Sequence, residues 1–297
     1  MSDRRPVEWP TLGLLAATYL AWGLGLFWLA TVSLWLAVPV VAVAAALHSS
    51  LSHEAIHGHP FPNERVNAAL VWLPLALFVP YLRFRDTHLA HHRDSILTDP
   101  YDDPESNYLD PSRWDRMPLW ARLLLRVNNT LAGRMLIGPI VGQIAFMAQD
   151  WSRRRDARVR AGWLWHLPGI AVLAVIVALS PMPLWAYLVA AYIALGLLKI
   201  RTFLEHQAHE KARARTVIIE DRGPLALLFL NNNLHVVHHM HPRVPWYRLP
   251  QVYARNPGRY LAVNEGYRYR SYAEVFARYL WRAKDPVPHP LWRSPQG

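Results

Sequence analysis

The fold is decided by residues 11–47, which read TLGLLAATYLAWGLGLFWLATVSLWLAVPVVAVAAAL and contain no charged side chain. At about 20 residues per membrane crossing, this run is long enough for two helices, one over residues 11–30 and one over residues 32–52. It is too long to be the apolar core of a cleaved signal peptide. We therefore expect a transmembrane hairpin over residues 11–52, with an uncharged turn near Ala30–Ser33.

Further apolar stretches occupy residues 65–82, 131–149, 162–180 and 183–200. The last two are joined by Ser180–Pro183 and predict a second hairpin over residues 162–200. Lys and Arg gather in the remaining segments, as expected for loops on the cytosolic side of a membrane. An even number of crossings must separate such loops, so residues 65–82 and 131–149 are expected to be embedded without spanning. The basic segments are Arg4 and Arg5, Arg83–Arg93, Arg153–Arg160 and the chain after Lys199.

These patterns predict an all-α integral membrane protein, organised as one domain over residues 1–297. Its four transmembrane helices form two hairpins, with embedded or interfacial helices beside them. Residues 83–130 and 201–285 are expected to form a helical cap on the cytosolic side of the inner membrane, where both termini also lie. Within the cap, residues 99–130, which combine three Asp-Pro pairs with the amphipathic stretch Met117–Val127, are expected to form a cytosolic lid. A net charge of +11 would suggest nucleic-acid binding if the chain were soluble. The long apolar runs argue against a soluble chain, so no nucleic-acid partner is expected.

Histidine is abundant, with 15 residues, and cysteine is absent, so any bound metal must be held by imidazole or oxygen. Two segments repeat the pattern H-x-x-H-H, at residues 88–92 and 235–239, and this spacing puts each triplet on one helical face. At this histidine content, the pattern is expected by chance roughly 0.04 times in the chain. With His53 and His57 at i, i+4, the repeats predict a polynuclear metal site.

Eight converging imidazoles exceed the coordination sphere of one ion, so two irons fit better than one zinc. His206, just after the last apolar stretch, is the expected ninth ligand, and His209 is the reserve. Helical geometry displaces His48, His59 and His241 by about 140–160° from the ligand faces, which leaves them outside the site. The predicted ligands are His53, His57, His88, His91, His92, His206, His235, His238 and His239.

Each ligand needs an acceptor for its second ring nitrogen, and polar side chains stand beside the three histidine segments. Solvated interface charges and helix caps remain alternative roles for these side chains. No side chain beyond the metal centre is predicted to be catalytic. The candidates for this supporting role are Glu54, Asp94, Glu205, Asn232 and Asn233.

The segments His53-Glu54-Ala55-Ile56-His57, His88-Leu89-Ala90-His91-His92 and His235-Val236-Val237-His238-His239 resemble the three histidine boxes of the membrane fatty-acid desaturase family. The resemblance extends from about Leu47 to Pro250. It implies a non-haem di-iron oxidase that uses O₂ and external electrons to attack an unactivated C–H bond, most simply to desaturate a lipid acyl chain. Hydroxylases and carotenoid ketolases share these boxes, so the product stays open.

The chain has no haem or dinucleotide-binding module, so electrons are expected from a separate protein of the ferredoxin or cytochrome b5 type. The basic residues of 153–160 and 211–215 either dock such an acidic donor or contact anionic lipid.

Two other classes compete with the oxidase. A zinc-dependent membrane hydrolase would explain His53-Glu54-Ala55-Ile56-His57 as an H-E-x-x-H motif, but it leaves both H-x-x-H-H segments without a role. A transporter would hold its site near the membrane midplane, whereas these histidines lie at one end of the apolar stretches.

Overall fold

The computed structural model describes residues 7–292; Arg4 and Arg5 lie outside this range. Within it, four helices are long and apolar enough to cross a membrane, which confirms the two predicted hairpins. They are Trp9–Val32, Leu34–Ile56, Ala157–Ala178 and Leu184–Thr202. The chain divides into two compact units, one formed up to Asp86 together with Gly142–Leu198, the other by Thr87–Val141 and the chain from Lys199 onward.

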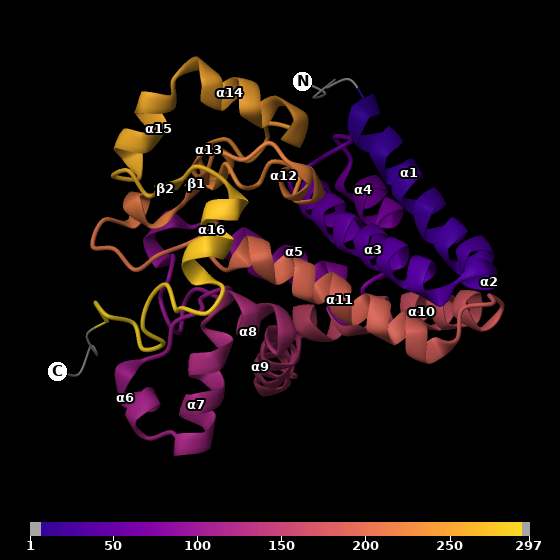
Figure 1. Cartoon of the computed structure of the whole chain (residues 1–297), viewed down its shortest axis with the longest axis horizontal. Helices are drawn as coiled ribbons and strands as arrows, with labels where there is room; N and C mark the ends of the chain where they lie inside the picture. The colour runs from indigo at the N-terminus through magenta and orange to yellow at the C-terminus, as the bar shows by residue number, and fades with distance from the viewer. Residues whose placement is uncertain (1–6, 293–297) are drawn as a thin grey trace. The chain divides into compact units, whose positions relative to one another are not determined.

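The first unit begins with the N-terminal hairpin. Helix α1 (Trp9–Leu24) continues through a π-helical turn and α2 to Val32, and it runs beside α3 (Leu34–Ile56) (Figure 1). Ser33 makes the break between them: its backbone is extended, and its side chain accepts a hydrogen bond from the Trp35 N–H. This uncharged cap lies where the sequence predicts the turn.

The second hairpin consists of α10 (Ala157–Ala178) and α11 (Leu184–Thr202), separated by the predicted turn. The two stretches predicted not to span are shorter and broken. Residues 65–82 contain α4 (Glu64–Leu70) followed by turns, and α5 (Tyr81–His91) begins at their end. Residues 131–149 contain α8 (Leu131–Leu136) and α9 (Gly138–Ser152), neither of which has the length of a membrane span.

A buried ion pair ties α5 to α9 within the first unit. The Arg83 guanidinium donates to both carboxylate oxygens of Asp150, at 2.9 and 2.7 Å, and both side chains are almost fully buried. Trp163 on α10 donates to the same carboxylate at 2.9 Å. A Cβ at position 162 would lie 2.8 Å from side-chain carbons of Arg83, so Gly162 provides the space in which the arginine passes α10.

Replacing Asp150 with alanine is expected to lower the free energy of unfolding by about 3–5 kcal/mol, because it leaves a buried guanidinium without its carboxylate. Urea unfolding of the protein in detergent micelles, followed by tryptophan fluorescence, would measure the loss. The control is Arg85→Ala at the partly exposed pair with Asp86, which leaves Arg83 and both of its carboxylate neighbours in place and should cost less than about 1 kcal/mol. Equal losses in the two variants would contradict a structural role for the buried pair.

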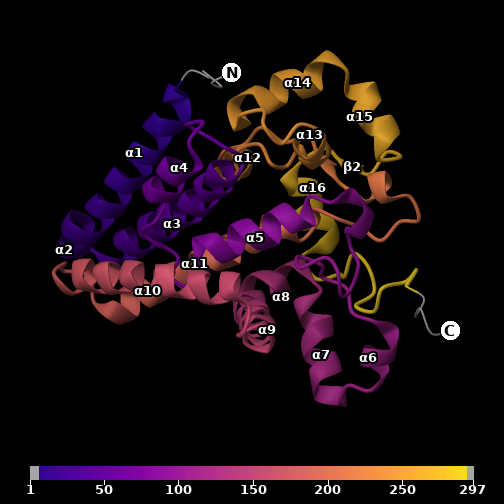
Figure 2. The same cartoon turned by 180° about the vertical axis from the view of Figure 1, so that it is seen from behind.

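The second unit is a set of short helices around one parallel strand pair, β1 (Ile218–Ile219) and β2 (Arg268–Tyr269). Helix α13 packs against β1 and α14, and it lies beside α14 in both views (Figures 1 and 2). Its apolar side chains Val236 and Val237 lie in a core with Ile218, Tyr253 and Tyr260. The helices of this unit are α6 (Pro111–Asp115), α7 (Leu119–Asn128), α8, α12 (Pro224–Leu228), α13 (His235–Met240), α14 (Leu249–Arg255), α15 (Pro257–Val263) and α16 (Tyr272–Tyr279), with 3-10 turns at Asp94–Ile96, Ala212–Arg215 and Trp246–Arg248.

Candidate metal centre

Four histidines of the second unit bring their ring nitrogens together within 4.8 Å of one another. The Nε2 atom of His206 lies 2.8 Å from Nε2 of His91 and 3.2 Å from Nε2 of His235. The His239 ring completes the group, with its centroid 4.6 Å from that of His235. Three separate segments contribute: α5, the segment after α11, and α13. The proposed ninth ligand, His206, is therefore placed among members of the second and third boxes.

A second group within the same unit contains the remaining members of the two H-x-x-H-H segments. The Nε2 atom of His92 lies 2.9 Å from Nε2 of His88 and 3.1 Å from Nε2 of His238. The His92 and His239 rings stack with centroids 4.3 Å apart, so the two groups adjoin. The helical spacing thus divides each box between two neighbouring sites.

The local backbone explains how α13 presents three imidazoles from only six residues. Leu230 and Asn231 have positive φ angles of 52° and 56°, which turn the chain sharply before the helix. Asn231 donates to the Trp246 carbonyl at 3.1 Å and holds this turn against the following segment. The apolar face of α13 is buried in the core described above, which leaves the histidine face for the site.

The first box lies in the first unit. His53 is in the last turn of α3 and His57 is the C-terminal cap of that helix, with ring centroids 4.8 Å apart. Both side chains are buried, as is Glu54 between them, whose carboxylate lies 3.8 Å from His53 Nδ1. The i, i+4 spacing therefore produces the paired imidazoles that the sequence predicts.

Two carboxylates that the sequence analysis did not select bind the outer nitrogens of the second box. His91 Nδ1 donates to Asp103 at 2.8 Å, and His88 Nδ1 donates to Glu105 at 3.2 Å. Asp103 is itself fixed, because it accepts hydrogen bonds from the backbone N–H groups of Thr98 and Glu105. Both acids lie in an irregular loop, so no helical spacing relates them to the histidines. The sequence indicates them only as acidic residues shortly after the second box.

The third box has its own support, which includes two predicted residues. His235 Nδ1 donates to the side-chain oxygen Oδ1 of Asn232 at 3.0 Å, and the side-chain amide of Asn232 donates to Glu205 at 3.1 Å. Arg201 pairs with Glu205 at 3.0 Å. Asn233 instead donates to the carbonyl oxygens of Ile219 and Asp221, so it holds the backbone of the unit. The side chain of Asp94 lies outside the described part of the structure.

The protonation of the second-unit groups follows from burial and nearby charge. Burial, aided by the surrounding histidines, holds the pKa of His206 and of His235 well below the ordinary value, so both are neutral near pH 7. Burial also opposes charge on His91, but Glu105 and Asp103 outweigh it and raise the pKa of His91 to about 9. A metal ion at His91 would therefore displace a proton.

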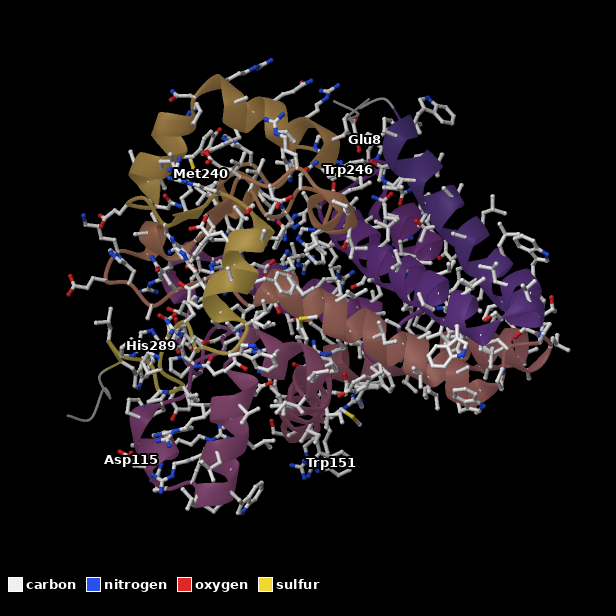
Figure 3. The ribbon with its side chains drawn as sticks, in the orientation of Figure 1. Glu8, Asp115, Trp151, Met240, Trp246 and His289 are labelled. Atoms are coloured by element: carbon white, nitrogen blue, oxygen red, sulfur yellow. The ribbon has the colours of Figure 1, made fainter. Side chains whose placement is uncertain are left out.

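The other histidines have different partners. His59 contacts Glu8 at 2.7 Å, His48 contacts the Tyr19 hydroxyl, and His166 contacts the Leu77 carbonyl oxygen. His209, the reserve ligand, lies 3.4 Å from Glu265 and lines a separate pocket with Asp99, Arg215 and His289. His241 packs its ring on Tyr260. His289, labelled in Figure 3, also contacts Thr98.

The donor set of the second unit fits two imidazole-bound metal ions. Since Nδ1 of His88, His91 and His235 donates to an acceptor, Nε2 of each is the nitrogen left for a metal, which at His91 takes the place of the second ring proton. Each of these Nε2 atoms faces another histidine of its group. Cysteine-free imidazole clusters, buried or half-buried and with carboxylates behind them, suit iron, and they match the demands of a non-haem di-iron centre.

Comparisons with known proteins agree with this chemistry. The family model described as "Fatty acid desaturase" matches residues 26–271. A beta-carotene ketolase from Paracoccus sp. (strain N81106 / MBIC 01143) is 29% identical over 210 residues, covering 68% of this chain and 72% of the relative. A second beta-carotene ketolase, from Paracoccus sp. (strain PC1), is 27% identical over 261 residues, covering 81% of this chain and 91% of the relative.

Proposed function

The chain belongs to the fatty acid desaturase family, and we propose that this integral membrane oxidoreductase converts a ring methylene of a carotenoid to a ketone. The observation that supports an oxidase is the pair of adjoining imidazole groups, each backed by carboxylate or amide acceptors. The substrate class is suggested by the two relatives named beta-carotene ketolase, one of which matches 68% of this chain and the other 81%. Acyl-lipid desaturation, the outcome predicted from the sequence, is the second candidate and is favoured by the family as a whole.

The proposal assigns all nine predicted histidines to two irons. His91, His206, His235 and His239 would hold one ion. His88, His92 and His238 would hold the other, and His53 and His57 of the first box are proposed to complete its ligands. When bound, the metal pair supplies reductive activation of O₂ for oxidation of a C–H bond.

The protein's own residues have defined tasks in this function. Asp103, Glu105 and Asn232 fix the ring orientation and tautomer of His91, His88 and His235. The four apolar helices place the protein in the bilayer from which a carotenoid or acyl chain would be taken.

Product analysis distinguishes the two candidate reactions. The gene should be expressed in bacteria that make β-carotene, and their pigments and fatty acids analysed by liquid chromatography and mass spectrometry. Ketone formation replaces two hydrogens of a methylene by one oxygen, whereas desaturation removes two hydrogens and adds nothing. A keto-carotenoid supports the proposal; unchanged pigment with new unsaturated acyl chains overturns the substrate class; a hydroxylated carotenoid overturns the proposed product but retains the substrate.

Electrons are proposed to come from an acidic protein of the ferredoxin or cytochrome b5 type, which binds on the cytosolic side of the inner membrane. Residues 242–264 contain four exposed arginines and no acidic residue, and they form α14 and α15 over α13. By contrast, Lys211 is paired with Glu265, and the Arg215 guanidinium donates to backbone carbonyl groups. The α14–α15 face is therefore the stronger candidate within the second unit. Its arginines are Arg243, Arg248, Arg255 and Arg259.

Charge reversal at Arg255 and Arg259 is expected to raise the apparent KM for ferredoxin about tenfold, because electrostatic steering sets the encounter rate. The loss should shrink as ionic strength rises. Steady-state turnover at several donor concentrations would measure it, with Arg153→Glu/Arg154→Glu in the loop after α9 as the matched control. If the control pair raises KM and the Arg255/Arg259 pair does not, the donor does not bind at α14–α15.

A further inference from the structure

Helix α7 (Leu119–Asn128) exposes an apolar face in the second unit. Five large side chains on it are between 40% and 69% exposed. At about 100° per residue they occupy one arc of about 140°, while the buried residues Ala121 and Asn128 lie together on another arc. The exposed residues are Leu119, Trp120, Leu123, Leu124 and Val127.

The contrast with α16 shows that this exposure is not a general property of short amphipathic helices here. Helix α16 (Tyr272–Tyr279) buries Tyr272 and Val275 and exposes Ala273, Ala277 and Arg278. Helix α7 does the opposite and leaves its most apolar side uncovered. Leu136 on α8, a helix that contacts α7, and Ile140 at the start of α9 are also exposed, at 66% and 52%.

The polar side of α7 is basic. The helix contains Arg122 and Arg126 and no acidic residue, and the arginines occupy the arc that adjoins Leu119. Arg126 lies over the Trp114 ring of α6 at 5.7 Å, so its charge is held at the edge of the apolar face. Helices α6 and α7 lie side by side in both views (Figures 1 and 2), and Asp115 marks the end of α6 in Figure 3.

We propose that α7 lies in the plane of the membrane and inserts its apolar face among the acyl chains of an anionic leaflet. An exposed apolar arc with a tryptophan, bordered by arginines, is the pattern of an interfacial helix. Arg122 and Arg126 then contact phosphate head groups. The occupant is a lipid surface because the four apolar spans already commit this chain to a bilayer. In place of the predicted lid, Met117–Val127 becomes a membrane anchor on the unit that holds seven of the nine proposed ligands.

The anchor is fixed to the carboxylate loop behind the second box. Helix α7 leads into α8, where the Arg134 guanidinium donates to the Asn128 carbonyl at 3.0 Å and also contacts Asn107. Asn107 lies in the loop that carries Asp103 and Glu105. A lipid contact at α7 would thus hold the loop that carries Asp103 and Glu105 at a constant distance from the membrane surface. The proposal does not depend on the identity of the substrate.

The natural absence of cysteine permits a direct test. Leu123→Cys, in the apolar face, and Ser112→Cys, exposed on α6, are each labelled with the fluorophore NBD in the full-length protein. The labelled proteins are reconstituted in nanodiscs of phosphatidylcholine with or without phosphatidylglycerol. We expect the emission of the Leu123→Cys label to shift to shorter wavelength and to be quenched by doxyl-labelled lipid, whereas the Ser112→Cys label is quenched by aqueous iodide.

Three results would contradict the proposal. Quenching of the Leu123→Cys label by iodide places the face in water, and a label protected from both quenchers places it against protein, from the same chain or a second copy. Phosphatidylglycerol should increase quenching by doxyl lipid, and Arg122→Gln/Arg126→Gln should remove that increase. Equal quenching in both lipid mixtures, with or without the arginines, would contradict the assignment to an anionic surface.

Discussion

Replacing His239 with alanine is expected to remove at least one iron per chain and to lower turnover by more than about a hundredfold. Its ring contacts histidines of both second-unit groups, with centroids 4.3 Å from His92, 4.6 Å from His235 and 5.1 Å from His206. Loss of a side chain that only hydrogen-bonds to a metal ligand already costs about 10–100-fold in metal affinity or activity. Loss of a ligand itself should therefore cost more. Metal analysis of the purified protein and product formation in membranes would measure both effects.

The matched control is His241→Ala, two residues further along the chain. His241 caps α13, and its ring packs on Tyr260. This variant should keep its full iron content and most of its activity. Full iron and full activity in His239→Ala would contradict the ligand assignment, and an equal loss in both variants would indicate that α13 has unfolded.

The transmembrane part of the fold could be predicted from the sequence because its signal is additive along the chain. Residues 11–47 lack charge over nearly twice the length of one crossing, so no single residue in this run could change the prediction of a hairpin. Even the break at Ser33 follows from local chemistry, since a serine can cap the second helix. The non-spanning stretches followed from counting crossings against basic loops, and the structure indeed breaks them into α4, α8 and α9.

The histidine faces could also be predicted, because residues spaced i, i+3, i+4 lie on the same face of a helix. His206 could be chosen only from its position after the last apolar stretch. The support for the ligands was harder to foresee: Glu205 adjoins His206 and Asn232 precedes the third box in the sequence, whereas Asp103 and Glu105 reach His91 and His88 from a loop. No periodicity relates a loop to a helix, so pairings of this kind depend on tertiary structure.

Asp103 therefore provides the sharpest test of what the sequence did not reveal. Asp103→Asn is expected to weaken iron binding by about 10–100-fold, because the hydrogen bond to His91 Nδ1 loses its charged acceptor while the side chain keeps its size. Chelator competition on purified protein would measure the affinity. The neighbouring Asp102→Asn is the control, since that side chain is exposed, and it should leave the affinity unchanged. A thermal midpoint equal in both variants would exclude unfolding as the cause. If Asp103→Asn bound iron as tightly as the control, the loop carboxylate would have no part in holding the metal ligands.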